Sequence, residues 1–180
     1  VKYTQHLLPF IQALGGEAIM HPTGHSLIKA KMRGTGALLA GEMSGHFFFK
    51  ERWYGFDDAC YAGARLLEIL ANDTKNRKAQ EIFSCLPNSL STPELQVPID
   101  DEKKHDFIQR LQQRSFDAKV VMLDGLRVEY SDGWGLVRAS NTSPCLVLRF
   151  EAGSQGALSK IQRLFKAAIL SIDASLTLPF

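Results

Sequence analysis

The chain has 180 residues, of which 45% are hydrophobic and 22% are charged, a composition typical of a protein with a packed core. Its 21 basic and 19 acidic residues leave a formal net charge of +2, and neither half of the chain is a basic arm or an acidic tail. This balance excludes a disordered chain and argues against nucleic acid as the main partner, because binding of a phosphate backbone needs clustered positive charge.

Cysteines and apolar runs bear on where the protein works. Cys60, Cys85 and Cys145 are scattered, odd in number and in no metal-type spacing, so we expect free thiols in a reducing, cytoplasmic compartment. No apolar run approaches the roughly 20 residues of a membrane helix, and no signal peptide opens the chain. Since the chain opens on Val1 rather than Met, we interpret it as a fragment of a longer protein.

The first part of the chain alternates helices with short strands. The predicted elements are a helix over Thr4–Leu14 that starts late or kinks at Pro9, a strand over Glu17–Met20, a helix over Ser26–Arg33, a buried strand over Ala37–Gly41 and a helix over about 57–71. We expect Asp57 and Asp58 to cap this last helix rather than to form a catalytic carboxylate pair. The alternation predicts a partial three-layer α/β domain over residues 1–86, with helices on a mixed or parallel sheet.

A segment rich in Pro, Ser, Thr and Asn follows, and the pattern then changes. We predict a linker over residues 87–93 and a second domain over 94–180, with a β-hairpin at Asp124-Gly125. The predicted strands are Glu94–Ile99, Val120–Leu123, Arg127–Tyr130, Gly135–Arg138 and Leu146–Glu151; the predicted helices are Asp101–Gln113 and Ser154–Ser171, the latter with Leu158, Ile161, Leu164, Phe165 and Ala168 inward. Together they predict an α+β domain with an antiparallel sheet and helices on one face.

Gly41–His46 is the first candidate site. A predicted strand ends at Gly41, and ligands of open α/β sheets bind beyond the carboxyl ends of strands. Glu42 can accept two sugar hydroxyls, Ser44 can donate and accept, and His46 can move a proton near neutral pH. The alternative is a polar turn with a capping Glu, and the local sequence does not decide between the two.

Arg138–Thr142 is the second candidate site. Its arginine offers a fork of donors to phosphate oxygens, and the Ser, Asn and Thr that follow add further donors. The loop amides can form an anion-binding nest, while the alternative is an ordinary hairpin turn. A third loop offers His25 to an anion and Ser26 as a helix cap, and it is weaker alone.

Several motifs of catalysis are missing from the chain. It carries no Walker A loop, no G-x-G-x-x-G, no H-E-x-x-H and no Asp-rich metal loop. Phosphoryl transfer needs a metal or a cationic clamp together with a nucleophile. The two candidate loops therefore supply binding groups without an evident reacting group.

Three motifs carry a resemblance to a known family. Gly-Glu-Met-Ser-Gly-His at 41–46, Lys-Glu-Arg-Trp-Tyr-Gly-Phe-Asp-Asp at 50–58 and Arg-Ala-Ser-Asn-Thr at 138–142 resemble the bacterial phosphomannomutase/phosphoglucomutase family of α-D-phosphohexomutases. The resemblance covers essentially the whole chain and implies the latter part of the third domain and all of the fourth domain of a four-domain enzyme. Such enzymes interconvert 1-phospho and 6-phospho hexoses through a bisphosphorylated sugar.

The resemblance also implies a set of site residues. Those expected to contact substrate are Lys2, His25, Glu42, Met43, Ser44, Gly45, His46, Arg138, Ala139, Ser140, Asn141 and Thr142. His46 is the candidate for proton transfer. The phosphoserine nucleophile and the Mg²⁺ ligands would lie in the N-terminal domains, outside this chain, and a glucose 1,6-bisphosphate-type activator is expected.

We therefore expect the C-terminal half of a monomeric cytoplasmic enzyme, inactive alone, with a phosphosugar and the missing domains as its partners, and neither nucleic acid nor membrane. Two alternatives stay open: a non-catalytic phosphosugar-binding module or subunit of a split enzyme, and a structural or interaction domain with vestigial loops. A preference for mannose or glucose phosphates cannot be read from Glu42 and Ser44, because epimers at one hydroxyl differ by too little.

Overall fold

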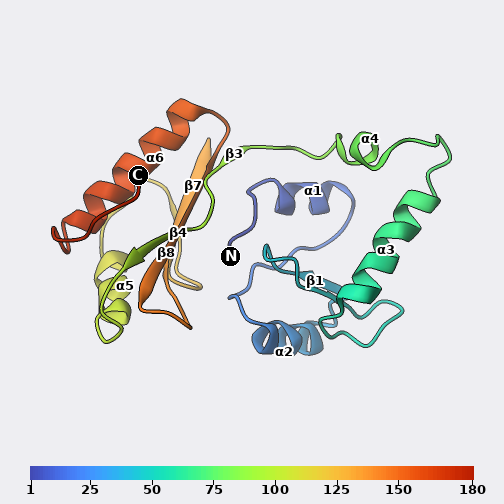
Figure 1. The fold of residues 1–180 in the computed structure, drawn as a ribbon, viewed down its shortest axis with the longest axis horizontal. Helices are drawn as coiled ribbons and strands as arrows, with labels where there is room; N and C mark the ends of the chain where they lie inside the picture. Colours follow the sequence, from blue (N-terminus) through green and yellow to red (C-terminus); the bar gives the residue numbers. More distant parts are fainter. The chain divides into compact units, whose positions relative to one another are not determined.

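The computed structural model describes residues 1–180, which fall into two compact units (Figure 1). One unit comprises Met20–Asn88 together with Lys2, and the other comprises Val1, Tyr3–Ile19 and Ser89–Phe180. By their contacts, residues 3–19 therefore group with the C-terminal part of the chain. No helix in either unit combines the length and the hydrophobicity that crossing a bilayer requires.

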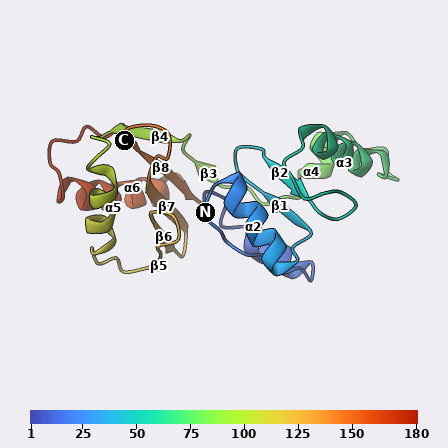
Figure 2. The same cartoon turned by 90° about the horizontal axis from the view of Figure 1, so that it is seen from below.

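The Met20–Asn88 unit is a small two-stranded sheet with helices around it. Its elements are α2 (His25–Thr35), β1 (Leu39–Gly41), β2 (Phe47–Phe49), α3 (Ala59–Ala71) and α4 (Ala79–Phe83). The sheet contacts α2 through β1 and α3 through β2 (Figure 2). Fully buried Phe48 joins Ile28 and Met32 of α2 in a small core, which fixes the strands against that helix.

Strand pairing in this unit differs from the prediction. β1 and β2 pair antiparallel, with Leu39 opposite Phe49, and no parallel pair forms within the chain. Their connection, residues 42–46, is too short for the crossover that parallel strands need. The predicted burial of β1 is also wrong, since Leu39 is 55% exposed; a two-stranded hairpin has too few neighbours to cover both faces. Residues 17–20 find no pairing partner and form no strand.

The helix starts agree with the prediction in part. α1 (Leu7–Ala13) begins late, as predicted, because Pro9 is tolerated only in a first turn. Asp58 caps α3 by accepting the Tyr61 amide at 2.9 Å, which confirms half of the expected Asp pair. The predicted cap at Ser26 is wrong. α2 begins after Gly24, whose φ of 137° is a backbone conformation that glycine favours.

The C-terminal unit contains an antiparallel sheet, as predicted, but with six strands where five were expected. Its strands run in the order β3 (Leu90–Ser91), β8 (Cys145–Ala152), β7 (Gly133–Ala139), β6 (Leu126–Tyr130) and β5 (Lys119–Val121), with β4 (Leu95–Pro98) also paired to β8. β3 lies within the segment 87–93 and pairs with the end of β8. The connection from β5 to β6 turns at Gly125, whose φ is 86°.

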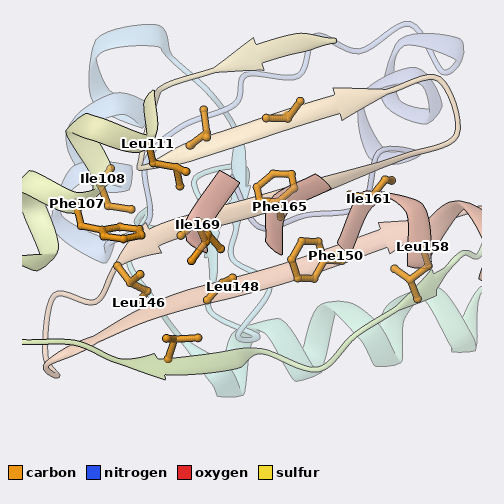
Figure 3. Close-up of a cluster of buried hydrophobic side chains, with 14 of the residues drawn as sticks. Phe107, Ile108, Leu111, Leu146, Leu148, Phe150, Leu158, Ile161, Phe165 and Ile169 are labelled. Carbon is orange, nitrogen blue, oxygen red and sulfur yellow. The ribbon is translucent and has the colours of Figure 1, made fainter. Parts of the chain in front are cut away.

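Two helices cover one face of this sheet and confirm the α+β architecture. α5 (Lys104–Gln112) and α6 (Gln155–Leu170) direct their apolar side chains onto β4, β6, β7 and β8 (Figure 3). Phe165 packs so closely on β7 that a Cβ at Gly135 would lie 2.5 Å from its ring. Leu164, predicted to point inward, is 42% exposed, and fully buried Ile169 belongs to the core instead. Ile169 follows Phe165 by four residues and stays on the same face of α6, whereas Leu164 falls at its edge.

The opposite face of the sheet is covered by the start of the chain. Arg127 Nη1 donates to the carbonyls of Val1 at 2.7 Å and Tyr3 at 3.0 Å, and Thr4 Oγ1 donates to Glu151 at 2.6 Å. Burial lowers the pKa of Arg127 and raises the pKa of Tyr3 to about 12. These contacts place β7 and β8 between two covered faces, which explains why nearly every residue of both strands is buried.

Candidate functional site

The loop between β1 and β2 is a tight hairpin turn. The Glu42 amide donates to the His46 carbonyl at 2.9 Å, and the Gly45 amide donates to the Glu42 carbonyl at 3.0 Å. Gly45 has a φ of 90°, which only glycine adopts without strain. Met43, Ser44 and His46 are exposed. A rigid backbone therefore presents these side chains to solvent.

Glu42 joins this turn to the start of α2. Its Oε1 accepts the Gly24 amide at 2.8 Å, and Oε2 takes no part in this contact. The carboxylate lies at a helix N-terminus, where the helix dipole stabilises negative charge. Glu42 thus accepts a backbone amide, as the capping interpretation expects, and its contact with a sugar hydroxyl stays a prediction. Exposed His25 is the next residue after Gly24 and comes into the same neighbourhood.

His46 pairs with a carboxylate that sequence reasoning assigned elsewhere. His46 Nδ1 lies 2.6 Å from Asp57 Oδ2. Asp57 was expected to cap α3, but it forms a β-bridge with Phe48, which turns its side chain to the hairpin instead. The structure therefore corrects the cap pair to one cap, Asp58, and one histidine partner, Asp57.

Between β2 and α3, the connection is fastened by a network of four charged side chains. Arg52 donates to both carboxylate oxygens of Glu68, at 2.9 and 2.8 Å, and its Nε lies 2.8 Å from Glu51. Arg65 of α3 reaches Glu51 at 2.6 Å. Hydrogen bonds from Arg65 and Arg52 hold the pKa of Glu51 below its usual value, and Arg52 does the same for Glu68. The network holds Arg52 at a φ of 58°, a conformation uncommon outside glycine.

Arg138 lies near the end of β7 and is 5% exposed. Its Nε donates to Asp124 Oδ2 at 3.2 Å, and its two terminal nitrogens take no part in this contact. A guanidinium held at Nε presents these nitrogens as a preset fork, the geometry that suits phosphate oxygens. Gly125 is needed beside it, since a Cβ there would lie 2.7 Å from the Arg138 backbone.

The loop after Arg138 is organised by Ser140. The Ser140 Oγ accepts the Thr142 amide at 3.3 Å and the Ser143 amide at 3.1 Å. The Thr142 amide, which was expected to face an anion in a nest, and the Ser143 amide thus turn toward this buried hydroxyl. Asn141 and Thr142 are exposed, and Ala139 is half-buried. Ligand contacts from this loop would therefore come mainly from side chains.

Lys104 is a basic residue near this loop that sequence reasoning missed. It is 5% exposed, and its Nζ donates to the Ser143 carbonyl at 3.3 Å and pairs with Asp101 at 2.6 Å. It shares the buried stripe of α5 with Phe107, Ile108 and Leu111. The sequence did indicate that Lys104 is buried, because it falls at helical spacing before these apolar residues.

The predicted site residues fall into two sets, one in each unit. His25 and Glu42–His46 lie together in the Met20–Asn88 unit, with which Lys2 is also grouped by its contacts. Arg138 and Ala139 end β7, and residues 140–142 begin the β7–β8 loop of the C-terminal unit. Each set is a constellation of its own, held by hydrogen bonds within its unit.

Two family descriptions match the chain over nearly its whole length. "Phosphoglucomutase/phosphomannomutase, alpha/beta/alpha domain III" matches residues 1–89, and "Phosphoglucomutase/phosphomannomutase, C-terminal domain" matches residues 94–168. The chain belongs to the phosphoglucomutase/phosphomannomutase family. The resemblance drawn from the three motifs is thereby confirmed, including its placement in the third and C-terminal domains.

Relatives named as enzymes share about half of the residues. A phosphomannomutase/phosphoglucomutase from Pseudomonas putida is 52% identical over 100% of this chain and 39% of its own length. A phosphoglucomutase from Neisseria gonorrhoeae is 55% identical over 95% of the chain and 37% of its own length. A solved phosphoglucomutase/phosphomannomutase family protein from Burkholderia thailandensis matches 99% of the chain and 38% of its own chain, with a TM-score of 0.90 and 52% identity. The chain thus spans about two fifths of the length of the relatives it matches.

Proposed function

We propose that this chain is the substrate-binding half of a phosphohexomutase that interconverts 1-phospho and 6-phospho hexoses of mannose or glucose through a bisphosphorylated sugar. The observation that carries the proposal is the 41–46 turn, where Glu42 is fixed on α2 and His46 on Asp57. This turn belongs to a chain 52% identical to a phosphomannomutase/phosphoglucomutase. Three thiols without disulfides fit a cytoplasmic enzyme, and we propose that it acts as a monomer.

Each set of side chains has a part in this function. Glu42 and Ser44 accept and donate hydrogen bonds to sugar hydroxyls, Met43 and Gly45 shape the turn, and His46 exchanges a proton at Nε2. Arg138, with the side chains of residues 140–142, holds the phosphate that is not reacting. Hydroxyls and phosphates are recognised by hydrogen-bonding groups rather than by a fitted apolar pocket, so one site can accept the sugar in two orientations.

Magnesium does not fit this chain. No group of three or more His, Cys, Asp or Glu side chains lies in an arrangement that could hold a metal ion. The ion and the phosphoserine would be supplied by the rest of the enzyme, and we propose that a bisphosphorylated hexose activates it. Lys2 and His25 complete the proposed set of contacts on the sugar phosphate.

A coupled assay tests the proposal. Glucose 1-phosphate or mannose 1-phosphate is supplied with Mg²⁺ and glucose 1,6-bisphosphate, first to the 180-residue chain and then to the protein that carries all the family's domains. We expect turnover by the complete protein and none by the chain. Absence of turnover by the complete protein would contradict the mutase function, and would favour a binding module if the bisphosphate still bound. Turnover by the chain alone would contradict the assignment of a half-site.

A further inference from the structure

The contact between His46 and Asp57 fixes where the imidazole carries its proton. An ionised carboxylate can only accept hydrogen bonds, so at 2.6 Å from Asp57 Oδ2 the His46 Nδ1 must be the donor. A neutral imidazole has one proton, which leaves Nε2 with a free lone pair. The His46 side chain is 52% exposed, and it makes no other hydrogen bond within the chain.

Asp57 is itself held in place from both sides. Its bridge to Phe48 ties it to β2. The next residue, Asp58, donates its amide to the Phe47 carbonyl at 3.4 Å and caps α3 with its side chain. The preceding turn is closed by the Gly55 amide on the Phe49 carbonyl at 2.8 Å. Backbone contacts with a strand and a helix therefore set the position of the Asp57 carboxylate.

We propose that Asp57 is a positioning residue that holds His46 as the Nδ1-protonated tautomer, with Nε2 presented as the proton acceptor for a sugar hydroxyl. This inference rests on the proposed function. A neutral histidine in water favours the proton on Nε2, so without Asp57 the ring would offer a donor where an acceptor is needed. The Asp–His arrangement of hydrolytic triads works by the same logic, since the carboxylate sets the tautomer and orientation of the ring.

Two isosteric variants one residue apart separate this role from general effects. Asp57→Asn removes the obligate acceptor from His46. Asp58→Asn makes the same change of charge at a residue whose carboxylate accepts from the Tyr61 amide and from Trp53 Nε1 rather than from His46, and asparagine is as good a helix cap as aspartate. Circular dichroism of both variants is compared with that of the wild type, so that a change of fold is recognised.

The first readout is the tautomer, measured in the 180-residue chain labelled with ¹⁵N-histidine. The chain has 5 histidines, and a His46→Gln variant assigns the signal. We expect protonated Nδ1 in the wild type and in Asp58→Asn, and a shift toward protonated Nε2 in Asp57→Asn. Protonated Nε2 in the wild type, or an unchanged tautomer in Asp57→Asn, would overturn the inference whatever the enzymatic activity proves to be.

The second readout is kinetic and uses the protein that carries all the family's domains. We expect Asp57→Asn to lower kcat at least roughly tenfold with little change in KM, since a positioned acid–base group contributes on the order of 100-fold or more. Asp58→Asn should retain the wild-type kcat. Equal kcat values for Asp57→Asn and an active wild type would refute the positioning role. An inactive wild type would refute the proposed function while leaving the tautomer result to be judged by itself.

Discussion

Replacing Gly125 by Ala is expected to lower both the stability of the C-terminal unit and the affinity of Arg138 for phosphate. Gly125 has a φ of 86°, and a Cβ built on it would lie 2.3 Å from the Val137 carbonyl oxygen and 2.7 Å from both Cα and Cβ of Arg138. All three atoms belong to backbone or to the root of a side chain in the buried strand β7. They cannot rotate away, so the turn must shift.

The expected loss of stability is the sum of two contributions. A left-handed conformation costs a residue with a Cβ about 1–2 kcal/mol, and forcing an extra methyl group into a packed site costs about 1–3 kcal/mol. We therefore expect Gly125→Ala to lower the free energy of unfolding by about 2–5 kcal/mol. The shift also draws Asp124 from its 3.2 Å contact with Arg138 Nε, so phosphate affinity should fall with stability.

Urea unfolding followed by circular dichroism measures the loss. Gly156→Ala is the matched control, because nothing lies within 4 Å of a Cβ at that position and it sits in the first turn of α6. Alanine in an exposed helix gains up to about 1 kcal/mol over glycine. A Gly125→Ala protein that unfolds at the wild-type urea midpoint would show that the close approach of the turn to β7 is not real.

Three further predictions concern single side chains. Phe165→Ala should lower the free energy of unfolding by about 3–5 kcal/mol, because the ring is fully buried between α6 and β7; a loss below 1 kcal/mol in urea unfolding would contradict this packing. Asp58→Ala should cost about 1 kcal/mol of helix cap, whereas Asp58→Asn should keep the cap and lose only the contact with Trp53 Nε1, so equal losses in the two variants would contradict the cap. Tyr3 should ionise with a pKa of about 12 by ultraviolet difference spectroscopy, since burial raises it. Because this folded-state pKa lies above the unfolded value of about 10, the contribution of Tyr3 to stability is present below pH 10 and is lost as the pH rises toward 12. Tyr3→Phe should remove this part of the loss of stability at alkaline pH, and an unchanged loss would contradict the burial of the Tyr3 hydroxyl.

Local patterns predicted the C-terminal unit well. Alternating apolar residues set the strands, the Asp124-Gly125 pair set a turn, and helical spacing set α5 and most of the buried face of α6. These patterns extend over only a few residues. Antiparallel strands that follow one another in the chain can pair through a short turn, so their pairing can be predicted from the same local patterns. The five predicted strands and two predicted helices bury their apolar residues against one another, which is why the α+β architecture could be predicted; β3 was missed because it has only two residues.

Pairings between distant residues could not be read in the same way. The β1–β2 hairpin was missed because each strand has only three residues, too few to show a period. Arg127 contacts Val1, 126 positions away in the chain, and no local pattern announces that contact. Asp57 was predicted to cap a helix because it directly precedes one in the sequence. Its contact with His46 depends on the bridge to Phe48, which only the fold shows.

The two candidate loops were found from residue types and order, but their internal geometry was not. Glu42, which was predicted to bind a ligand, places its Oε1 on the Gly24 amide. Ser140 proved to be the acceptor that organises its loop. Hydroxyl and carboxylate groups can serve backbone or ligand equally well, so sequence alone leaves that choice open.

The measurement that tests the central claim most directly is calorimetric titration of the complete protein with glucose 1,6-bisphosphate, comparing wild type, Arg138→Ala and a control at exposed Lys160 on α6. Each of the two substitutions removes one positive charge, so a difference between them reflects the position of Arg138 rather than the net charge. Arg138→Ala is expected to weaken binding by about 1.5–3 kcal/mol, the scale of a charge-assisted hydrogen bond, and Lys160→Ala to bind like the wild type. Equal affinities for wild type and Arg138→Ala would contradict the assignment of the Arg138–Thr142 loop to the phosphate.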